Sequence, residues 1–214
     1  MDENQSEYLP NAILLLGPTG SGKTPLGDLL ENEGLAGRKC FHFDFGAQLR
    51  GYAANPTDLL SEVELEIVKI SLGSGALLTD SQFGIAEKLL GEFIEKNRIG
   101  SGDLIIMNGM PRHAGQAAGL ERIIKMKAVV VLGCDAATVR ERICTNAGGD
   151  REGRVDDTKE DVVRKLAIFA EKTLPLLKFY EGYGIPVIHI DVGTNDSAIK
   201  SRGALVVKIT NIFD

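Results

Sequence analysis

Short, largely apolar runs alternate along the chain with longer amphipathic stretches. The runs cover residues 13–16, 40–43, 104–107, 128–132 and 186–190. Continuous apolarity over four or five residues is typical of a strand that is covered on both faces, as in a parallel sheet. The pattern therefore predicts five strands, each with both faces buried.

The stretches between the runs have the periodicity of helices. Thr79 and Gln82 form a capping box before one such stretch, and Thr158 is the expected N-cap of another. Pro175 should kink the second helix, because proline removes a donor and crowds the preceding turn. The two stripes are Phe83, Ala86, Leu90, Phe93 and Ile94, then Val162, Leu166, Phe169, Ala170, Leu174, Leu177 and Tyr180. The alternation predicts a single α/β domain over residues 1–214, a five-stranded parallel sheet with about eight helices on both faces.

Composition narrows the possible classes of protein. The chain has 214 residues and a net charge of −6, so it lacks the overall basic field of a nucleic-acid or lipid-surface binder and must bind any anion locally. Cys40, Cys134 and Cys144 are too few and too far apart for a disulfide framework, and the three histidines lack metal-site spacing. The N-terminus does not resemble a signal peptide, and its apolar run is too short to span a bilayer. A soluble, cytoplasmic protein is therefore expected.

One motif dominates the sequence. Residues 17–24 match G-x-x-x-x-G-K-[ST] and stand between a predicted strand and a predicted helix. Glycines let the backbone turn tightly and aim its N–H groups at an anion, so that Lys23 reaches the β- and γ-phosphates and the Thr24 hydroxyl can ligate Mg²⁺. The alternative is a glycine-rich turn that binds nothing. The predicted ATP-binding residues here are Gly17, Pro18, Thr19, Gly20, Ser21, Gly22, Lys23 and Thr24.

Four further segments combine glycines with arginines and amides. They are residues 46–50 (GAQLR), 75–80 (GALLTD), 108–116 (NGMPRHAGQ) and 153–157 (GRVDD). In order and spacing they resemble the motifs G-D-L-L-R, G-x-L-V-P-D, D-G-F-P-R-x-x-x-Q and G-R-x-D-D of the adenylate kinase family of nucleoside monophosphate kinases. The resemblance extends from residue 12 to about residue 195. It implies a P-loop kinase that transfers the γ-phosphoryl group of ATP, with Mg²⁺, to a nucleoside monophosphate.

The resemblance also implies roles for individual residues. Arg50 and Arg112 would bind the acceptor phosphate, Arg154 would stabilise the moving phosphoryl group, Arg142 would stack on the donor adenine and Gln116 would hydrogen-bond the acceptor base. The implied catalytic residues are Lys23, Arg112, Arg154 and Lys165. The implied acceptor site comprises Phe45, Gly46, Arg50, Leu78, Gly109, Arg112 and Gln116. Such cations suit a reaction that brings several phosphates together, and no general base is needed because the acceptor oxygen is already ionised.

Plainer interpretations stay open for two of these arginines. Arg142 could lie on a solvated helix face, and Arg154 could be an ordinary loop residue. Two segments are expected to move and exclude water, a helical acceptor-binding insert at about 45–74 and a short glycine-rich lid at about 146–156.

Two departures from the family pattern concern the metal and the acceptor base. Asn108 stands where the family has an aspartate that helps to hold Mg²⁺ through water, and an amide brings no charge. Asn108→Asp should therefore raise turnover or tighten the Mg²⁺ dependence, unless Asp44 or Asp80 already supplies that acid. Phe45 replaces a usual threonine near the acceptor base and offers stacking area without a hydrogen bond.

Two further departures remove arginines. Asn146 and Lys165 align with family arginines, and Lys165 keeps the charge but not the planar fork. Arg151 and Arg164 are neighbours that could substitute.

Three hypotheses follow. The first is a monomeric nucleoside monophosphate kinase, adenylate kinase before others, that uses ATP and Mg²⁺ and binds no nucleic acid or membrane. The second is a kinase of the same fold that acts on CMP, UMP or another small anion. The third is a regulatory protein that binds ATP without phosphorylating anything, for which Asn108 and Asn146 are the motive.

Overall fold

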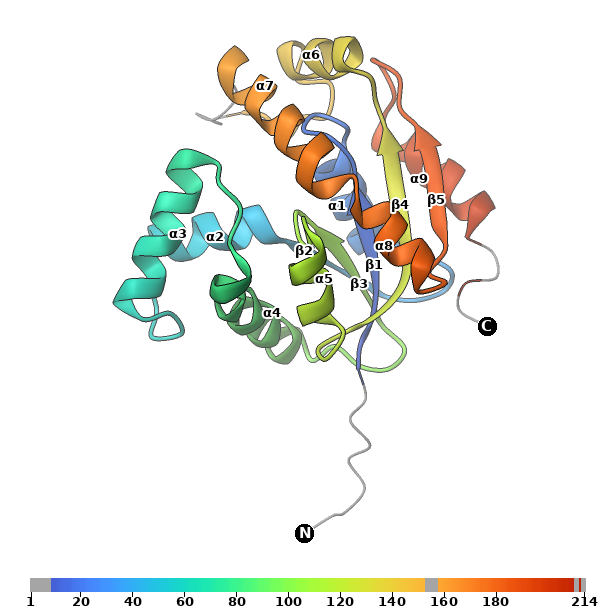
Figure 1. Ribbon diagram of the computed structural model, residues 1–214. Helices are drawn as coiled ribbons and strands as arrows, with labels where there is room; N and C mark the ends of the chain where they lie inside the picture. The colour runs from blue at the N-terminus through green and yellow to red at the C-terminus, as the bar shows by residue number, and fades with distance from the viewer. Residues whose placement is uncertain (1–8, 153–157, 210–211, 213–214) are drawn as a thin grey trace.

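A five-stranded parallel sheet forms the centre of the molecule in the computed structural model, which describes residues 9–152, 158–209 and 212 (Figure 1). The strands are β1 (Asn11–Leu16), β2 (Cys40–Asp44), β3 (Leu104–Asn108), β4 (Lys125–Gly133) and β5 (Val187–Asp191). Their order is β2-β3-β1-β4-β5, and every neighbouring pair is parallel. The five predicted strands are confirmed, and the largest difference is β4, which begins before its apolar run, at Lys125.

Helices connect the strands. They are α1 (Lys23–Glu33), α2 (Phe45–Ala54), α3 (Glu62–Ser74), α4 (Phe83–Asn97), α5 (Ala114–Leu120), α6 (Ala136–Cys144), α7 (Lys159–Ile168), α8 (Leu176–Gly182) and α9 (Ala198–Lys208). The capping box of Thr79 and Gln82 is present, although it opens a short 3₁₀ turn directly before α4. Thr158 caps α7 as predicted. Pro175 marks a break, because α7 passes into a π-helical turn (Phe169–Thr173) and α8 begins directly after the proline.

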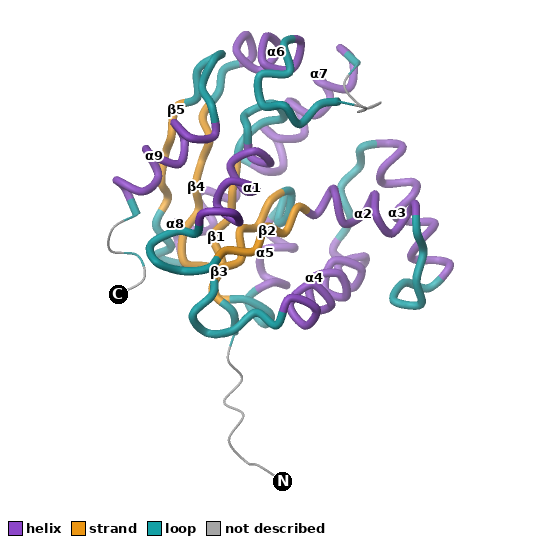
Figure 2. Tube along the Cα trace, turned by 180° about the vertical axis from the view of Figure 1, so that it is seen from behind, coloured by secondary structure: helices purple, strands orange, loops and turns teal. Residues whose placement is uncertain are grey.

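Alternate residues of the central strand serve two cores. Ile13 and Leu15 pack with α1 and α9 on one face of the sheet, whereas Leu14 and Leu16 pack with α4, α5 and α8 on the other. Figures 1 and 2 show these helices on opposite sides of the sheet. Burial of both faces explains why the strands appear in the sequence as continuous apolar runs.

The carboxyl ends of the five parallel strands all lie at the same edge of the sheet. The strand order reverses beside β1, and ligands of open α/β sheets bind at such a point. At this edge β1 continues into residues 17–22, and β2 continues directly into α2. Helices α2 and α3 stand to one side of the sheet, beyond β2 (Figure 1).

The predicted acceptor insert at about 45–74 corresponds to α2 and α3, and its role stays a prediction. The predicted lid at about 146–156 is described only to residue 152, and the rest lies outside the described residues. Within the described ranges, every helix is too short or too polar to traverse a bilayer.

Candidate active site

The loop of residues 17–22 joins β1 to α1 and presents the N-terminus of that helix. Gly20 and Gly22 have φ angles of 79° and 92°, a backbone conformation that side chains oppose. Gly22 is the N-cap of α1 and supplies no capping side chain, so the first N–H groups of the helix are available to a ligand. Together with the helix dipole, these groups form an anion-binding concavity.

Lys23 is the first residue of α1, and its side chain folds back onto this loop. Its Nζ donates hydrogen bonds to the carbonyl oxygens of Gly17 and Pro18 at 2.8 and 2.7 Å. Burial first, and then the nearby charges of Arg112 and Arg151, lower the pKa of Lys23 to about 7, although the charge of Asp44 opposes the shift. Burial and neighbouring cations disfavour the charged ammonium, so an anion that binds in the pocket would stabilise it.

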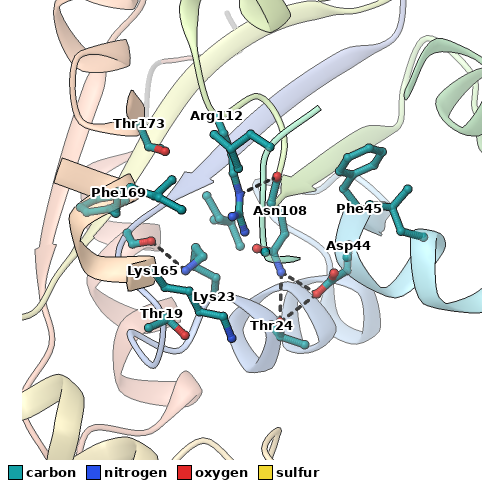
Figure 3. Close-up of a pocket in the computed structure, with 18 of the residues that line it drawn as sticks. Thr19, Lys23, Thr24, Asp44, Phe45, Asn108, Arg112, Lys165, Phe169 and Thr173 are labelled. Carbon is teal, nitrogen blue, oxygen red and sulfur yellow. Dashed lines mark hydrogen bonds between the residues drawn. The ribbon is translucent and has the colours of Figure 1, made fainter. Parts of the chain in front are cut away.

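Several cations line one pocket with Lys23. They come from separate parts of the chain: Arg50 from α2, Arg112 from the segment after β3, Arg151 from the segment after α6 and Lys165 from α7. Figure 3 shows Lys23, Arg112 and Lys165 around the same space. The structure therefore brings together the predicted residues Lys23, Arg50, Arg112 and Lys165. Arg154 lies outside the described residues.

The predicted acceptor residues all line this pocket as well. Two of them are occupied with other contacts. The Gln116 side chain is buried, accepts a hydrogen bond from the Arg112 amide at 2.8 Å and donates one to the Leu78 carbonyl at 3.0 Å. Phe45 is only 6% exposed and packs near Phe43. Gln116 thus positions Arg112, and its hydrogen bond to an acceptor base stays a prediction, for which the amide still has a second N–H and a second oxygen lone pair.

Arg142 lies beneath the loop, outside the residues that line the pocket. Its Nε donates to the carbonyl of Gly20, and one terminal nitrogen donates to the carbonyls of Gly193, Thr194 and Asp196. It is only 4% exposed, so the alternative of a solvated helix face is wrong. The arginine joins the loop to the segment after β5, and its stacking on adenine stays a prediction.

A polar network closes the side of the pocket next to Thr24. Asp44 Oδ2 accepts hydrogen bonds from Thr24 Oγ1 and Asn108 Nδ2, each at 2.9 Å. Asn108 Nδ2 also lies 3.3 Å from Nε2 of His42, whose Nδ1 is 2.8 Å from the carboxylate of Asp28. Figure 3 shows the bonds that join Thr24, Asp44 and Asn108. Of the two acids named as substitutes for the missing aspartate, Asp44 is therefore the one in the site.

Asp80 is elsewhere. Its carboxylate pairs with Nδ1 of His113 at 3.3 Å, and its side chain is 74% exposed.

The two arginines named as substitutes lie in different places, and only Arg151 is among the residues that line the pocket. Arg151 lines the pocket, its guanidinium reaches Thr19 Oγ1 at 3.2 Å, and its backbone N–H donates to Asn146 Oδ1 at 3.0 Å. Arg164 instead pairs with Asp161 at 2.6 Å. Residues that the sequence analysis missed are Asp150, Phe169 and Thr173. The last two come from the π-helical turn, and no motif marks them, although such turns are frequent at functional sites.

Comparison with known proteins gives a consistent result. The chain is 31% identical to the adenylate kinase of Prochlorococcus marinus (strain MIT 9211) over 204 residues, which covers 92% of this chain and 98% of that protein. It is 32% identical to an adenylate kinase of Thermus thermophilus over 200 residues, covering 91% and 96%, and 33% identical to that of Bartonella bacilliformis over 188 residues, covering 81% and 88%. No family model matches the chain.

Proposed function

The chain belongs to the adenylate kinase family, and from this premise we propose that it transfers the γ-phosphoryl group of ATP to AMP, which gives two molecules of ADP. One observation carries the proposal for this particular chain. Although its net charge is −6, it gathers Lys23, Arg50, Arg112, Arg151 and Lys165 around a single pocket at the carboxyl ends of the strands. Cations clustered in this way offset the mutual repulsion of several phosphates that must approach one another.

The reaction needs positioning and charge more than it needs proton transfer. An ionised oxygen of the acceptor phosphate forms a bond to the γ-phosphorus, and the bond from that phosphorus to the β–γ bridging oxygen breaks with its electron pair on ADP. The loop amides and Lys23 hold the donor phosphates and stabilise the charge that develops on the leaving ADP. Arg112 and Arg50 hold the acceptor phosphate, and Arg154 and Lys165 stabilise the group in transfer. Because the acceptor is already ionised, no side chain has to act as a base.

Mg²⁺ is proposed to accompany ATP. The Thr24 hydroxyl and the Asp44 carboxylate are oxygen donors that lie 2.9 Å apart at the side of the loop, which is the donor type that this ion prefers. When bound, the ion would neutralise charge on the β- and γ-phosphate oxygens. Among the residues that the structure describes, no three or more His, Cys, Asp or Glu side chains group as metal ligands. That fits an ion that keeps most of its water and phosphate ligands.

A panel of acceptors tests the proposal. Purified protein with Mg-ATP is offered AMP, CMP, UMP and GMP in turn, and ADP release is measured. We expect release with AMP above all. Release with another monophosphate only would favour a kinase of the same fold with a different acceptor, for which the buried Phe45 is the motive. Binding of ATP without turnover, at high enzyme concentration, would leave a regulatory ATP-binding protein.

We propose that the enzyme acts as a monomer, which sedimentation velocity tests.

A further inference from the structure

Asp44 and Asn108 face each other across two neighbouring strands. They are register partners at the carboxyl ends of β2 and β3, and Asn108 also pairs with Leu15 of β1. This register sets the Asp44 carboxylate beside Asn108, on the strand that lies between β2 and the strand before residues 17–22. The two oxygens of this carboxylate make different contacts. Oδ1 caps α2 by accepting a hydrogen bond from the Ala47 amide at 2.9 Å, and Oδ2 accepts hydrogen bonds from Thr24 and Asn108.

The surroundings of Asn108 explain why this position is an amide. Its Nδ2 group donates to Asp44 Oδ2 and to Thr24 Oγ1 at 3.1 Å, and it lies 3.3 Å from His42 Nε2. An aspartate here would set a second carboxylate oxygen where Nδ2 now donates to Asp44 at 2.9 Å. Two carboxylates that close disfavour double ionisation. The site therefore has room for one negative charge without a cation, and this chain carries it on residue 44.

We propose that Asp44 is the carboxylate that holds the Mg²⁺ of Mg-ATP in this protein, beside the Thr24 hydroxyl, and that Asn108 positions it. This proposal rests on the proposed function, since it assumes that Mg-ATP is the substrate. Mg²⁺ is held in nucleotide sites by one or two carboxylates together with phosphates and water, so a single acid is sufficient. In this chain the acid therefore stands at the end of β2 and not at the end of β3, where Asn108 is the amide that orients it.

The metal can be measured apart from catalysis. Mn²⁺ replaces Mg²⁺ as a paramagnetic probe, and its binding to the protein–ATP complex is titrated by electron paramagnetic resonance in wild type and in Asp44→Asn. Asparagine caps a helix as well as aspartate does, so the substitution removes the charge and keeps the cap. We expect the affinity of the complex for Mn²⁺ to fall about tenfold or more. ATP affinity in the presence of EDTA should stay the same or rise, because a negative charge has left the pocket.

Two further variants make the test specific. The exchange Asp44→Asn with Asn108→Asp moves the carboxylate to the other side of the same contact, and it should recover part of the Mn²⁺ affinity. Asp135→Asn is the matched control, because Asp135 caps α6 in the same way, through the Thr138 amide at 2.7 Å, and does not line the pocket. It should leave Mn²⁺ affinity unchanged.

The outcomes separate this proposal from the proposed function. Mn²⁺ affinity in folded Asp44→Asn within twofold of wild type would overturn the role of Asp44 and leave it as a helix cap only. Absence of phosphoryl transfer from the wild-type protein would overturn the kinase assignment, while the Mn²⁺ titration would still report on Asp44. Circular dichroism of each variant shows that the fold is kept.

Asn108→Asp alone gives a second measure. The structure changes the expectation that it simply raises turnover, because the new carboxylate would face Asp44. The variant should have a lower unfolding temperature than wild type in EDTA and should gain more from added Mg²⁺. An unfolding temperature equal to that of wild type in both conditions would contradict the close pairing of the two positions.

Discussion

The phosphate loop (residues 17–24) and the side-chain wall of the pocket present positive charge to the pocket by different means. The loop is a run of consecutive residues, 17–24, that uses backbone N–H groups and one lysine. The side-chain wall consists of Arg50, Arg112, Arg151 and Lys165, which come from four separate segments. A loop of this kind depends on fixed backbone angles at its glycines, so its residues have little freedom to change. Long side chains can reach the same point from several backbone positions. The cations of the wall can therefore stand at different sequence positions and still line the same pocket.

The strongest test of this comparison removes one cation from each region. Lys23→Ala and Arg112→Ala should each lower turnover at saturating substrates by about a hundredfold or more, since loss of one preorganised charge at the transition state costs about 3 kcal/mol. The unfolding temperature should change little, because both residues bond to exposed or loop carbonyls. Near-wild-type turnover in either variant would contradict the assignment of that region to the site.

The pKa of Lys23 leads to a test of the loop alone. Its value of about 7 in the free protein should rise when ATP binds, because phosphate oxygens stabilise the ammonium. Below this pKa the lysine is charged in both states and affinity is constant. Above it, binding must take up a proton, and affinity for ATP should fall by up to about tenfold per pH unit. Calorimetry at about pH 8 in buffers of different ionisation enthalpy measures that uptake.

The variant Lys23→Ala is the control for this titration. Its residual ATP affinity should lose the pH dependence. A dependence of equal size in the variant would assign the proton to another group.

The difference between the regions also explains what the sequence could predict. The strands and the phosphate loop follow from local patterns, an apolar run of four or five residues and a motif with fixed spacing. Asp44 and Arg151 had to be inferred from the absence of an expected aspartate and arginine, and each had a competitor, Asp80 and Arg164. The choice between them depends on strand register and on the course of the chain after α6, which are properties of the folded molecule. No local pattern distinguishes the competitors.

Gln116 is a case in which the residue type suggests a role but the folded contacts restrict it. Its type and spacing fit the recognition of a base, yet tertiary contacts with Arg112 and Leu78 use both ends of its amide. Phe45 likewise fits stacking by residue type, whereas packing against Phe43 buries it. Residue type defines what a side chain can do, and packing decides how much of that capacity is left for a ligand.

Arg151 and Arg164 form a matched pair for the side-chain wall. Arg151→Ala should lower turnover roughly tenfold, the value of one charge-assisted hydrogen bond. Arg164→Ala should stay within twofold, because Arg164 pairs with Asp161 and is not among the residues that line the pocket. Equal losses of turnover in the two variants would show that Arg151 has no special role in the pocket.

The smallest expected effect concerns Asn146, whose side chain hydrogen-bonds to the backbone of Arg151. Asn146 has a φ angle of 50°, and its Oδ1 accepts the hydrogen bond from the Arg151 amide. Asn146→Gly removes the bond but tolerates the angle, whereas Asn146→Ala removes the bond and adds backbone strain of about 1 kcal/mol. Both variants should lower turnover by about two- to threefold, since one neutral hydrogen bond contributes about 1 kcal/mol or less. Only the alanine variant should also lower the unfolding temperature appreciably. Wild-type turnover in the glycine variant would mean that Arg151 holds its place in the pocket without the hydrogen bond to Asn146.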